Sequence, residues 1–246
     1  MRKILLYILS LLFVLPNLAQ TRTDSLAVKS NFKAGELIVP LSLVGVGALG
    51  FVEPIKGVCV DLQGSVNNWR GDGHTTVVDD YLQYVPLASV YGLSLLGAEA
   101  KHGYVDRTLE VGVACVALVG IVGGAKFLIP KERPDGSDFN SFPSGHSAKV
   151  FMGAELVRIE YGEEHPWLAV GAYTIATATG ALRVYNNHHW ISDVIAGAGV
   201  CILSARIGYW LLPYTRRAMH RITGWDVFVA PSASSEGAAL NAVVRF

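Results

Sequence analysis

Long apolar segments separated by short polar ones dominate this chain. Six apolar runs follow a polar stretch near the N-terminus, at residues 37–52, 81–98, 109–129, 147–161, 166–182 and 191–212. No run alternates apolar and polar residues with a period of two, so helices are expected rather than strands. We therefore predict an all-α fold in which six helices form a bundle, and we assign residues 37–212 to this helical domain.

The two ends of the chain differ from this pattern. Residues 1–20 begin with MRK, continue with ILLYILSLLFVL and end with PNLAQ, which is typical of a signal peptide cleaved near Ala19 or Gln20. The alternative is a short uncleaved anchor. The polar residues 21–36 are interpreted as a linker, and residues 53–80 as a polar loop. Residues 213–246 carry Val and Phe on both sides of SSEG, which predicts a tail or a small C-terminal β-hairpin.

The composition favours a bundle embedded in a membrane. Hydrophobic residues make up 51% of the chain and charged residues 16%, against about 25% charged in soluble domains. Many of the 26 glycines lie inside apolar runs, as in membrane helices that pack closely. The zero net charge gives no field that would attract nucleic acid. Three cysteines without a CxxC pair indicate neither a disulfide framework nor a thiolate zinc site.

Basic residues after the last apolar run suggest an orientation. The cluster contains Arg216, Arg217, His220 and Arg221, and such clusters favour the cytoplasmic side. Alternating the runs backwards then places the polar ends described below outside, facing the periplasm of a bacterial envelope. A cleaved signal peptide conflicts with this count, and run 37–52 is short for a membrane span. A periplasmic bundle that only leans on the membrane is the alternative.

Polar residues gather where four of the apolar runs begin or end. One cluster contains Lys126 and Arg133, and Pro134 biases Arg133 away from helix. Cations held on a helix end and in an extended loop can converge on one anion, and arginine offers a planar fork of donors for phosphate. The alternative is that both are basic residues extending from a membrane edge towards water.

A second cluster, Pro-Ser-Gly-His, precedes the fourth run. Ser144 is a good N-cap residue, and Gly145 lets a ligand approach the backbone closely. The start of a helix directs free N–H groups and partial positive charge at that ligand. His146, in the first turn, could give a proton to a leaving oxygen. The alternative is an ordinary helix cap with a surface histidine.

The third cluster lies in RVYNNHHWISD. His189 and Asp193 are four residues apart and would share one helix face, where the carboxylate could keep one imidazole nitrogen protonated and leave the other as a nucleophile. Arg183 would supply a third cation, and His188 is a flanking polar residue. A metal site of His146, His188, His189 and Asp193 is the competing interpretation. The three cations would repel a divalent ion, so no metal or other cofactor is expected.

Taken in order, the clusters read Lys-x6-Arg-Pro, Pro-Ser-Gly-His and Arg-x5-His-x3-Asp. Over residues 37–212 the chain resembles the type 2 phosphatidic acid phosphatase (PAP2) family, which also contains bacterial acid phosphatases and vanadium haloperoxidases. One position departs from the pattern, because Leu182 stands where the family usually has Ser before the arginine of the third motif.

The resemblance implies a phosphatase mechanism without a metal. Phosphate would be bound by Lys126, Arg133, Ser144, Gly145 and Arg183. His189 would attack phosphorus and form a phosphohistidine, Asp193 would fix the tautomer of His189, and His146 would protonate the leaving alcohol. Apolar helices favour envelope lipids as substrates: lipid A, phosphatidic acid, phosphatidylglycerol phosphate or undecaprenyl pyrophosphate. A soluble periplasmic acid phosphatase is the alternative and a vanadium haloperoxidase a remote one. No motif indicates an oligomeric state.

Overall fold

The computed structural model describes residues 31–71, 73–224, 226–234 and 237–245. The predicted signal peptide, residues 1–20, lies outside the described residues, as does most of the predicted linker.

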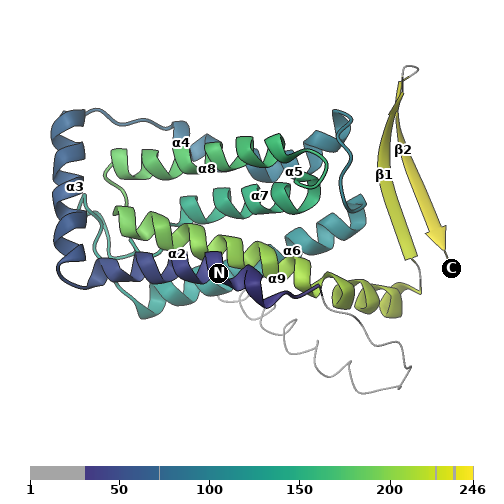
Figure 1. Cartoon of the computed structure of the whole chain (residues 1–246), viewed down its shortest axis with the longest axis horizontal. Coiled ribbons are helices and arrows are strands. Elements are labelled where there is room, and N and C mark those ends of the chain that lie inside the picture. The colour runs from purple at the N-terminus through teal and green to yellow at the C-terminus, as the bar shows by residue number, and fades with distance from the viewer. Residues whose placement is uncertain (1–30, 72, 225, 235–236, 246) are drawn as a thin grey trace.

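The described chain is a bundle of α-helices followed by a β-hairpin (Figure 1). The helices are η2 (Ala34–Leu37), α2 (Ile38–Ala48), η3 (Leu49–Phe51), α3 (Ile55–Arg70), α4 (Val78–Leu82), α5 (Val85–Leu95), α6 (Tyr104–Leu128), α7 (Gly145–Tyr161), α8 (Pro166–Tyr185) and α9 (Ile191–Thr223). Strands β1 (Asp226–Ser234) and β2 (Gly237–Arg245) pair antiparallel, with Asp226 opposite Arg245. The predicted helical bundle is confirmed, and the C-terminal segment forms the hairpin rather than an extended tail.

Helix α9 runs through the middle of the bundle, and α2, α6 and α7 pack against it (Figure 1). Glycines set how closely these helices approach. A Cβ at Gly199 would lie 2.6 Å from the carbonyl oxygen of Pro40 in α2, and one at Gly208 would lie 2.5 Å from the carbonyl oxygen of Glu110 in α6. At these two positions glycine allows the backbones of neighbouring helices to pack directly together, as in membrane helices.

Three stretches among the described residues are long and apolar enough to cross a membrane: Ala34–Phe51, Tyr104–Leu128 and Ile191–Thr223. The first extends the predicted run 37–52 to 18 residues by including the 3-10 turns at its ends. Large apolar side chains on α2, such as Ile38 and Val39, are exposed. This is the surface expected where lipid, rather than protein, covers a helix.

The prediction of a loop over residues 53–80 is wrong, because this segment contains α3 and the first residues of α4. Helix α3 lies across one end of the bundle, beside the end of α8 (Figure 1). Two of its side chains bind carbonyl groups at the end of α8: Gln63 donates to Val184 at 2.9 Å, and Arg70 donates to Tyr185 at 2.8 Å. The packed face of α3 is therefore largely polar, which is why a search for apolar runs does not find it.

Helix α9 continues past residue 212, where the sequence predicted the helical domain to end. Pro213 has no N–H to donate to the carbonyl of Tyr209, four residues earlier. The side-chain amide of Asn31 donates to that carbonyl at 3.3 Å instead, so the helix passes through the proline. It ends at Gly224, whose φ of 72° is the left-handed conformation that favours glycine after a helix.

Candidate active site

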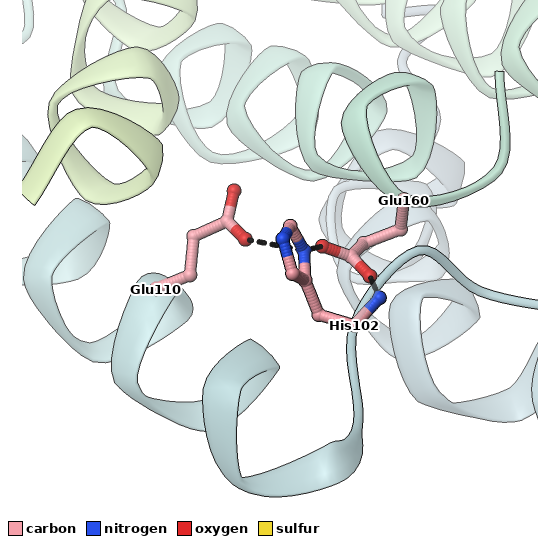
Figure 2. A group of neighbouring side chains, drawn as sticks. All are labelled: His102, Glu110 and Glu160. Carbon is pink, nitrogen blue, oxygen red and sulfur yellow. Dashed lines mark hydrogen bonds and ion pairs between the residues drawn. The ribbon is translucent and has the colours of Figure 1, made fainter. Parts of the chain in front are cut away.

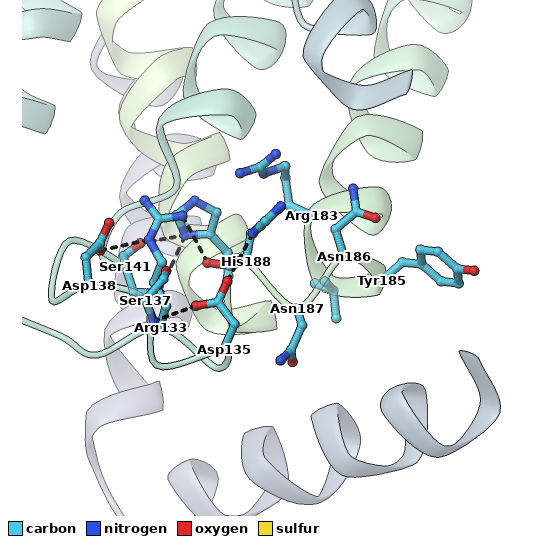
Figure 3. A network of polar contacts seen from close by, with 12 residues as sticks. Arg133, Asp135, Ser137, Asp138, Ser141, Arg183, Tyr185, Asn186, Asn187 and His188 are labelled. Atoms are coloured by element: carbon cyan, nitrogen blue, oxygen red, sulfur yellow. Dashed lines mark hydrogen bonds and ion pairs between the residues drawn. The ribbon is translucent and has the colours of Figure 1, made fainter. Parts of the chain in front are cut away.

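The three polar clusters meet at the end of the bundle where α6 and α8 end and α7 and α9 begin. The N–H of Ser144 donates to the carbonyl of Asp193 at 3.0 Å, which joins the starts of α7 and α9. Arg133 donates to the carbonyl of His188 at 3.3 Å, which joins the loop after α6 to the loop after α8. Figure 3 shows this loop-to-loop contact, with Arg183 facing it from the end of α8.

Residues 129–144, between α6 and α7, form a loop with two paired arms. The N–H of Ser141 donates to the carbonyl of Lys131 at 3.0 Å, and the N–H of Arg133 donates to that of Asp138 at 3.0 Å. Gly136 turns the chain between them with a φ of 70°. The side chain of Asp138 also accepts from Nε of Arg133 at 2.8 Å, so this arginine has a fixed direction (Figure 3).

The chain reverses at the end of α8 in a Schellman motif. Asn187 has the left-handed conformation, with a φ of 63°, and its N–H donates to Val184 at 3.0 Å. The N–H of His188 donates to the carbonyl of Arg183 at 3.1 Å. Asparagine is one of the few residues other than glycine that adopts this conformation readily. The reversal brings His188 and His189 back beside Arg183.

The orientation of His189 leaves one ring nitrogen available for chemistry. The side chain is buried, and its Nδ1 lies 2.8 Å from the carbonyl oxygen of Ser141. A carbonyl can only accept a hydrogen bond, so Nδ1 carries the proton and Nε2 carries the lone pair. Burial first, and then the charges of Arg133, Arg183 and Lys126, lower the pKa of His189 well below its usual value. The imidazole is therefore neutral at neutral pH.

Asp193 reaches His189 through a serine. Its carboxylate accepts from Nζ of Lys131 at 2.7 Å, from the hydroxyl of Ser141 at 2.5 Å and from the N–H of Trp190 at 3.2 Å. The Ser141 hydroxyl lies 3.5 Å from Nδ1 of His189. The sequence predicted a direct contact from the spacing of four residues, but α9 begins after His189, at Ile191. Helical spacing does not apply across that boundary.

His146 lies in the first turn of α7, with its Nε2 3.1 Å from a carboxylate oxygen of Asp80 in α4. Burial, followed by the charges of Arg183 and Lys149, lowers the pKa of His146 to about 4. The carboxylates of Asp80 and Asp79 act in the opposite direction. A bound phosphate would add another negative charge beside His146 and would raise its pKa above this lowered value. His146 can therefore become a proton donor when substrate is present.

Arg183 is buried against acidic residues of α4. Its guanidinium lies 2.5 Å from Asp79 and 3.6 Å from Asp80, and the amide of Asn186 also donates to Asp79, at 2.9 Å. The Nε of Arg183 is buried and has no hydrogen-bond partner among the described residues. Leu182 offers no hydroxyl next to it, so the polar support of this arginine comes from α4.

The start of α7 has room for a ligand. Ser144 caps the helix as predicted, and its hydroxyl accepts from the hydroxyl of Ser147 at 3.0 Å. A Cβ added at Gly145 would meet nothing within 4 Å, so this side of the helix start is open among the described residues. Lys126, at the end of α6, donates to the carbonyl of Asn140.

Four residues of the site escaped the sequence analysis: Asp79, Asp80, Lys131 and Ser141. Two weak signals were present, namely a second lysine inside KERP and a hydroxyl just before the Pro-Ser-Gly-His motif. The residues proposed for the competing metal site lie near different partners. His188 faces Asp135 at 3.1 Å, whereas His146 faces Asp80 and His189 faces the Ser141 carbonyl.

The helix ends bring histidines, cations and an open helix N-terminus together. This combination is typical of a helical protein that binds an anion. Residues 107–217 match the model of the PAP2 superfamily. The matched segment contains all three motifs, in agreement with the resemblance predicted from them.

Similar proteins include a lipid A 1-phosphatase from Porphyromonas gingivalis, 39% identical over 142 residues that make up 57% of this chain and 32% of that protein. The chain thus spans about a third of the length of this relative. Two solved structures are also similar. LpxE from Aquifex aeolicus has a TM-score of 0.46 and 20% identity, over 60% of this chain and 92% of its own. A PAP2-type phosphatidylglycerolphosphate phosphatase from Bacillus subtilis has a TM-score of 0.39 and 18% identity, over 74% of this chain and 98% of its own.

Proposed function

We propose that this protein is a phosphatase that hydrolyses phosphate monoesters or pyrophosphates of envelope lipids through a phosphohistidine. The observation that carries the proposal is the state of His189. Its Nδ1 proton is committed to the Ser141 carbonyl, and its unprotonated Nε2 is the nucleophile. The positive charges of Arg133, Arg183 and Lys126 all lower the pKa of this imidazole, which keeps it neutral.

In the proposed reaction, Nε2 of His189 forms a bond to phosphorus while the bond to the leaving oxygen breaks. His146 gives its proton to that oxygen. A water molecule then attacks phosphorus and gives a proton back to His146, the N–P bond breaks, and inorganic phosphate leaves. Lys126, Arg133 and Arg183, with the N–H groups at the start of α7, bind the phosphate oxygens and stabilise the negative charge of both transition states.

Apolar side chains around the site support a lipid substrate. Several are more than 60% exposed at this end of the bundle: Trp69 of α3, Val77 beside α4, Tyr81 of α4, Phe127 and Leu128 of α6, and Phe139 of the loop. Exposed apolar groups that surround a polar site indicate contact with a membrane or with acyl chains. The similarity to a lipid A 1-phosphatase makes lipid A the first substrate to test.

The arrangement of charges supports a site that faces the periplasm. Arg216 and Arg221 lie near the end of α9, whereas the site lies at its start. If the basic end is cytoplasmic, a single crossing by α9 puts the site on the other side of the membrane. We propose this location in a bacterial envelope.

Phosphate release by the purified chain in detergent, with EDTA present, tests this function. The panel contains lipid A, phosphatidic acid, phosphatidylglycerol phosphate, undecaprenyl pyrophosphate and a soluble aryl phosphate. We expect release from at least one lipid at a rate well above that from the aryl ester. Release from the aryl ester alone would contradict the lipid assignment and favour an acid phosphatase for small esters. Loss of all activity in EDTA would contradict the metal-independent mechanism.

The contact between Asp80 and His146 gives a prediction for pH dependence. The carboxylate of Asp80 favours the protonated imidazole, so Asp80→Asn should lower the pKa of His146 from its value of about 4. Less of the proton donor is then present at any pH above that value, and kcat/KM should fall. Because Asp80 is exposed, the pair contributes about 0.2–1 kcal/mol, a change of up to about fivefold.

The pH profile of kcat/KM checks this prediction. We expect the alkaline limb of the profile to move to lower pH in Asp80→Asn. The exposed Asp61 on α3 provides a control, and Asp61→Asn should leave the profile in place. An unchanged alkaline limb in Asp80→Asn would show that Asp80 does not support His146.

A further inference from the structure

A histidine and two glutamates converge at the end of the bundle opposite the candidate active site. His102 lies in the connector between α5 and α6, Glu110 in the second turn of α6, and Glu160 in the last turn of α7. One ligating atom from each lies within 4.8 Å of those of the other two. Figure 2 shows the two carboxylates on either side of the imidazole ring.

Glu110 carries the argument, because its buried carboxylate has no hydrogen bond among the described residues and only a long contact with His102. The side chain is 1% exposed, and neither of its oxygens has a hydrogen-bond partner among the described residues. It points towards His102, and its nearer oxygen lies 4.0 Å from Nδ1 of that ring. A carboxylate removed from water in this way is costly unless a proton or a cation accompanies it.

The other two groups are already held in place. Glu160 accepts from Nδ1 of His102 at 2.7 Å and from the N–H of the same residue at 3.0 Å. The N–H of Lys101 donates to the backbone carbonyl of Glu160 at 2.8 Å. The connector is thus fixed against the end of α7, and Glu110 faces both groups from α6.

We propose that His102, Glu110 and Glu160 bind a divalent transition-metal cation, with zinc as the best fit. Zinc takes imidazole nitrogen at 2.0–2.1 Å and carboxylate oxygen at 2.0–2.2 Å, so the donor atoms of a tetrahedral site lie about 3.3 Å apart. The separations of 2.7 Å and 4.0 Å from Nδ1 lie on either side of that value. Small side-chain movements would bring these separations to the value of a tetrahedral site, and a water molecule would be the fourth ligand.

The surrounding charges fit a cation. Two carboxylates and a neutral imidazole balance a charge of +2. Two neighbouring cations are already paired: Lys101 with Glu163 at 3.2 Å, and Arg206 with Glu155 at 2.5 Å. The bound ion would join the α5–α6 connector to α6 and α7, far from the histidines of the candidate active site.

Zinc binding by the full chain in detergent tests the proposal. The protein is stripped with a chelator, desalted and titrated with zinc by calorimetry, and the retained metal is measured by mass spectrometry. We expect one zinc ion per chain and a rise in the thermal unfolding midpoint when zinc is added. Glu110→Gln keeps the shape of the side chain and removes its charge, and it should weaken binding by roughly 100-fold.

Two further variants make the result specific. His102→Gln changes a ligand in the connector and should weaken zinc binding to a similar degree. Glu163→Gln removes a charge from an exposed neighbour outside the three ligands and should leave binding unchanged. Gel filtration and circular dichroism verify that each variant is folded. Absence of zinc binding by the unmodified chain would overturn the proposal and indicate that Glu110 holds a proton instead. Equal binding by the unmodified chain, Glu110→Gln and His102→Gln would also overturn it.

Discussion

Replacing His189 by alanine is expected to lower kcat by at least about 10⁴-fold, the range found when a covalent nucleophile is removed. No other described group has the same geometry, with one nitrogen bound to a backbone carbonyl and the other free beside three cations. The buried Ser141 carbonyl loses its donor, which costs about 1–3 kcal/mol of stability. The bundle should therefore remain folded, and the loss should be one of chemistry.

The neighbouring histidine provides a matched control. His188 is half-exposed and faces Asp135 rather than the Ser141 carbonyl. His188→Ala should therefore keep kcat within about tenfold of the unmodified chain. Phosphate release and thermal unfolding are measured for both variants. Full activity in His189→Ala, or equal losses in the two variants, would show that His189 is not the nucleophile.

Asp79→Ala is expected to have the largest effect on stability. Asp79 is fully buried and forms an ion pair at 2.5 Å with Arg183, whose side chain is also buried. Removal of Asp79 leaves buried Arg183 with only the longer contact to Asp80 at 3.6 Å, and breaking a buried pair in this way destabilises by about 3–5 kcal/mol. Asp79 also accepts from Asn186, so the end of α8 loses a second contact.

Thermal or chemical unfolding in detergent measures this loss. Asp61→Ala, at an exposed position on α3, is the control and should change the free energy of unfolding by no more than about 0.5 kcal/mol. Phosphate at high concentration should partly restore the stability of Asp79→Ala, because the proposed site gives Arg183 a new anionic partner. A variant as stable as the unmodified chain would contradict the buried pair.

The sequence located the helices whose apolar residues form long runs, because those residues must be covered by lipid or by other helices. It missed α3, which buries Gln63 against the end of α8 and therefore has a polar composition on its packed face. The sequence also placed the end of the last helix at residue 212. It could not show that Asn31, far away in the chain, donates to the Tyr209 carbonyl that Pro213 leaves without a donor.

The motifs were sufficient to predict which residues gather at the candidate site. The chain order of the three clusters indicated that antiparallel helices bring them together, and the structure does so. The partners of those residues were not predictable. Asp79 approaches Arg183 from a short helix more than a hundred positions earlier in the chain, and Ser141 stands between Asp193 and His189 because a loop folds back. Such contacts follow from loop geometry, which has no sequence period.

The central claim is that phosphate passes through His189. A lipid substrate labelled with ³²P in its phosphate, mixed rapidly with the chain in detergent and EDTA and quenched in base, tests it most directly. The account predicts label on the protein that is stable in base, labile in acid and mapped to the peptide containing His189. It also predicts that His189→Ala acquires no label while His188→Ala does. Label on another residue, or label on His189→Ala equal to that on the unmodified chain, would contradict the account.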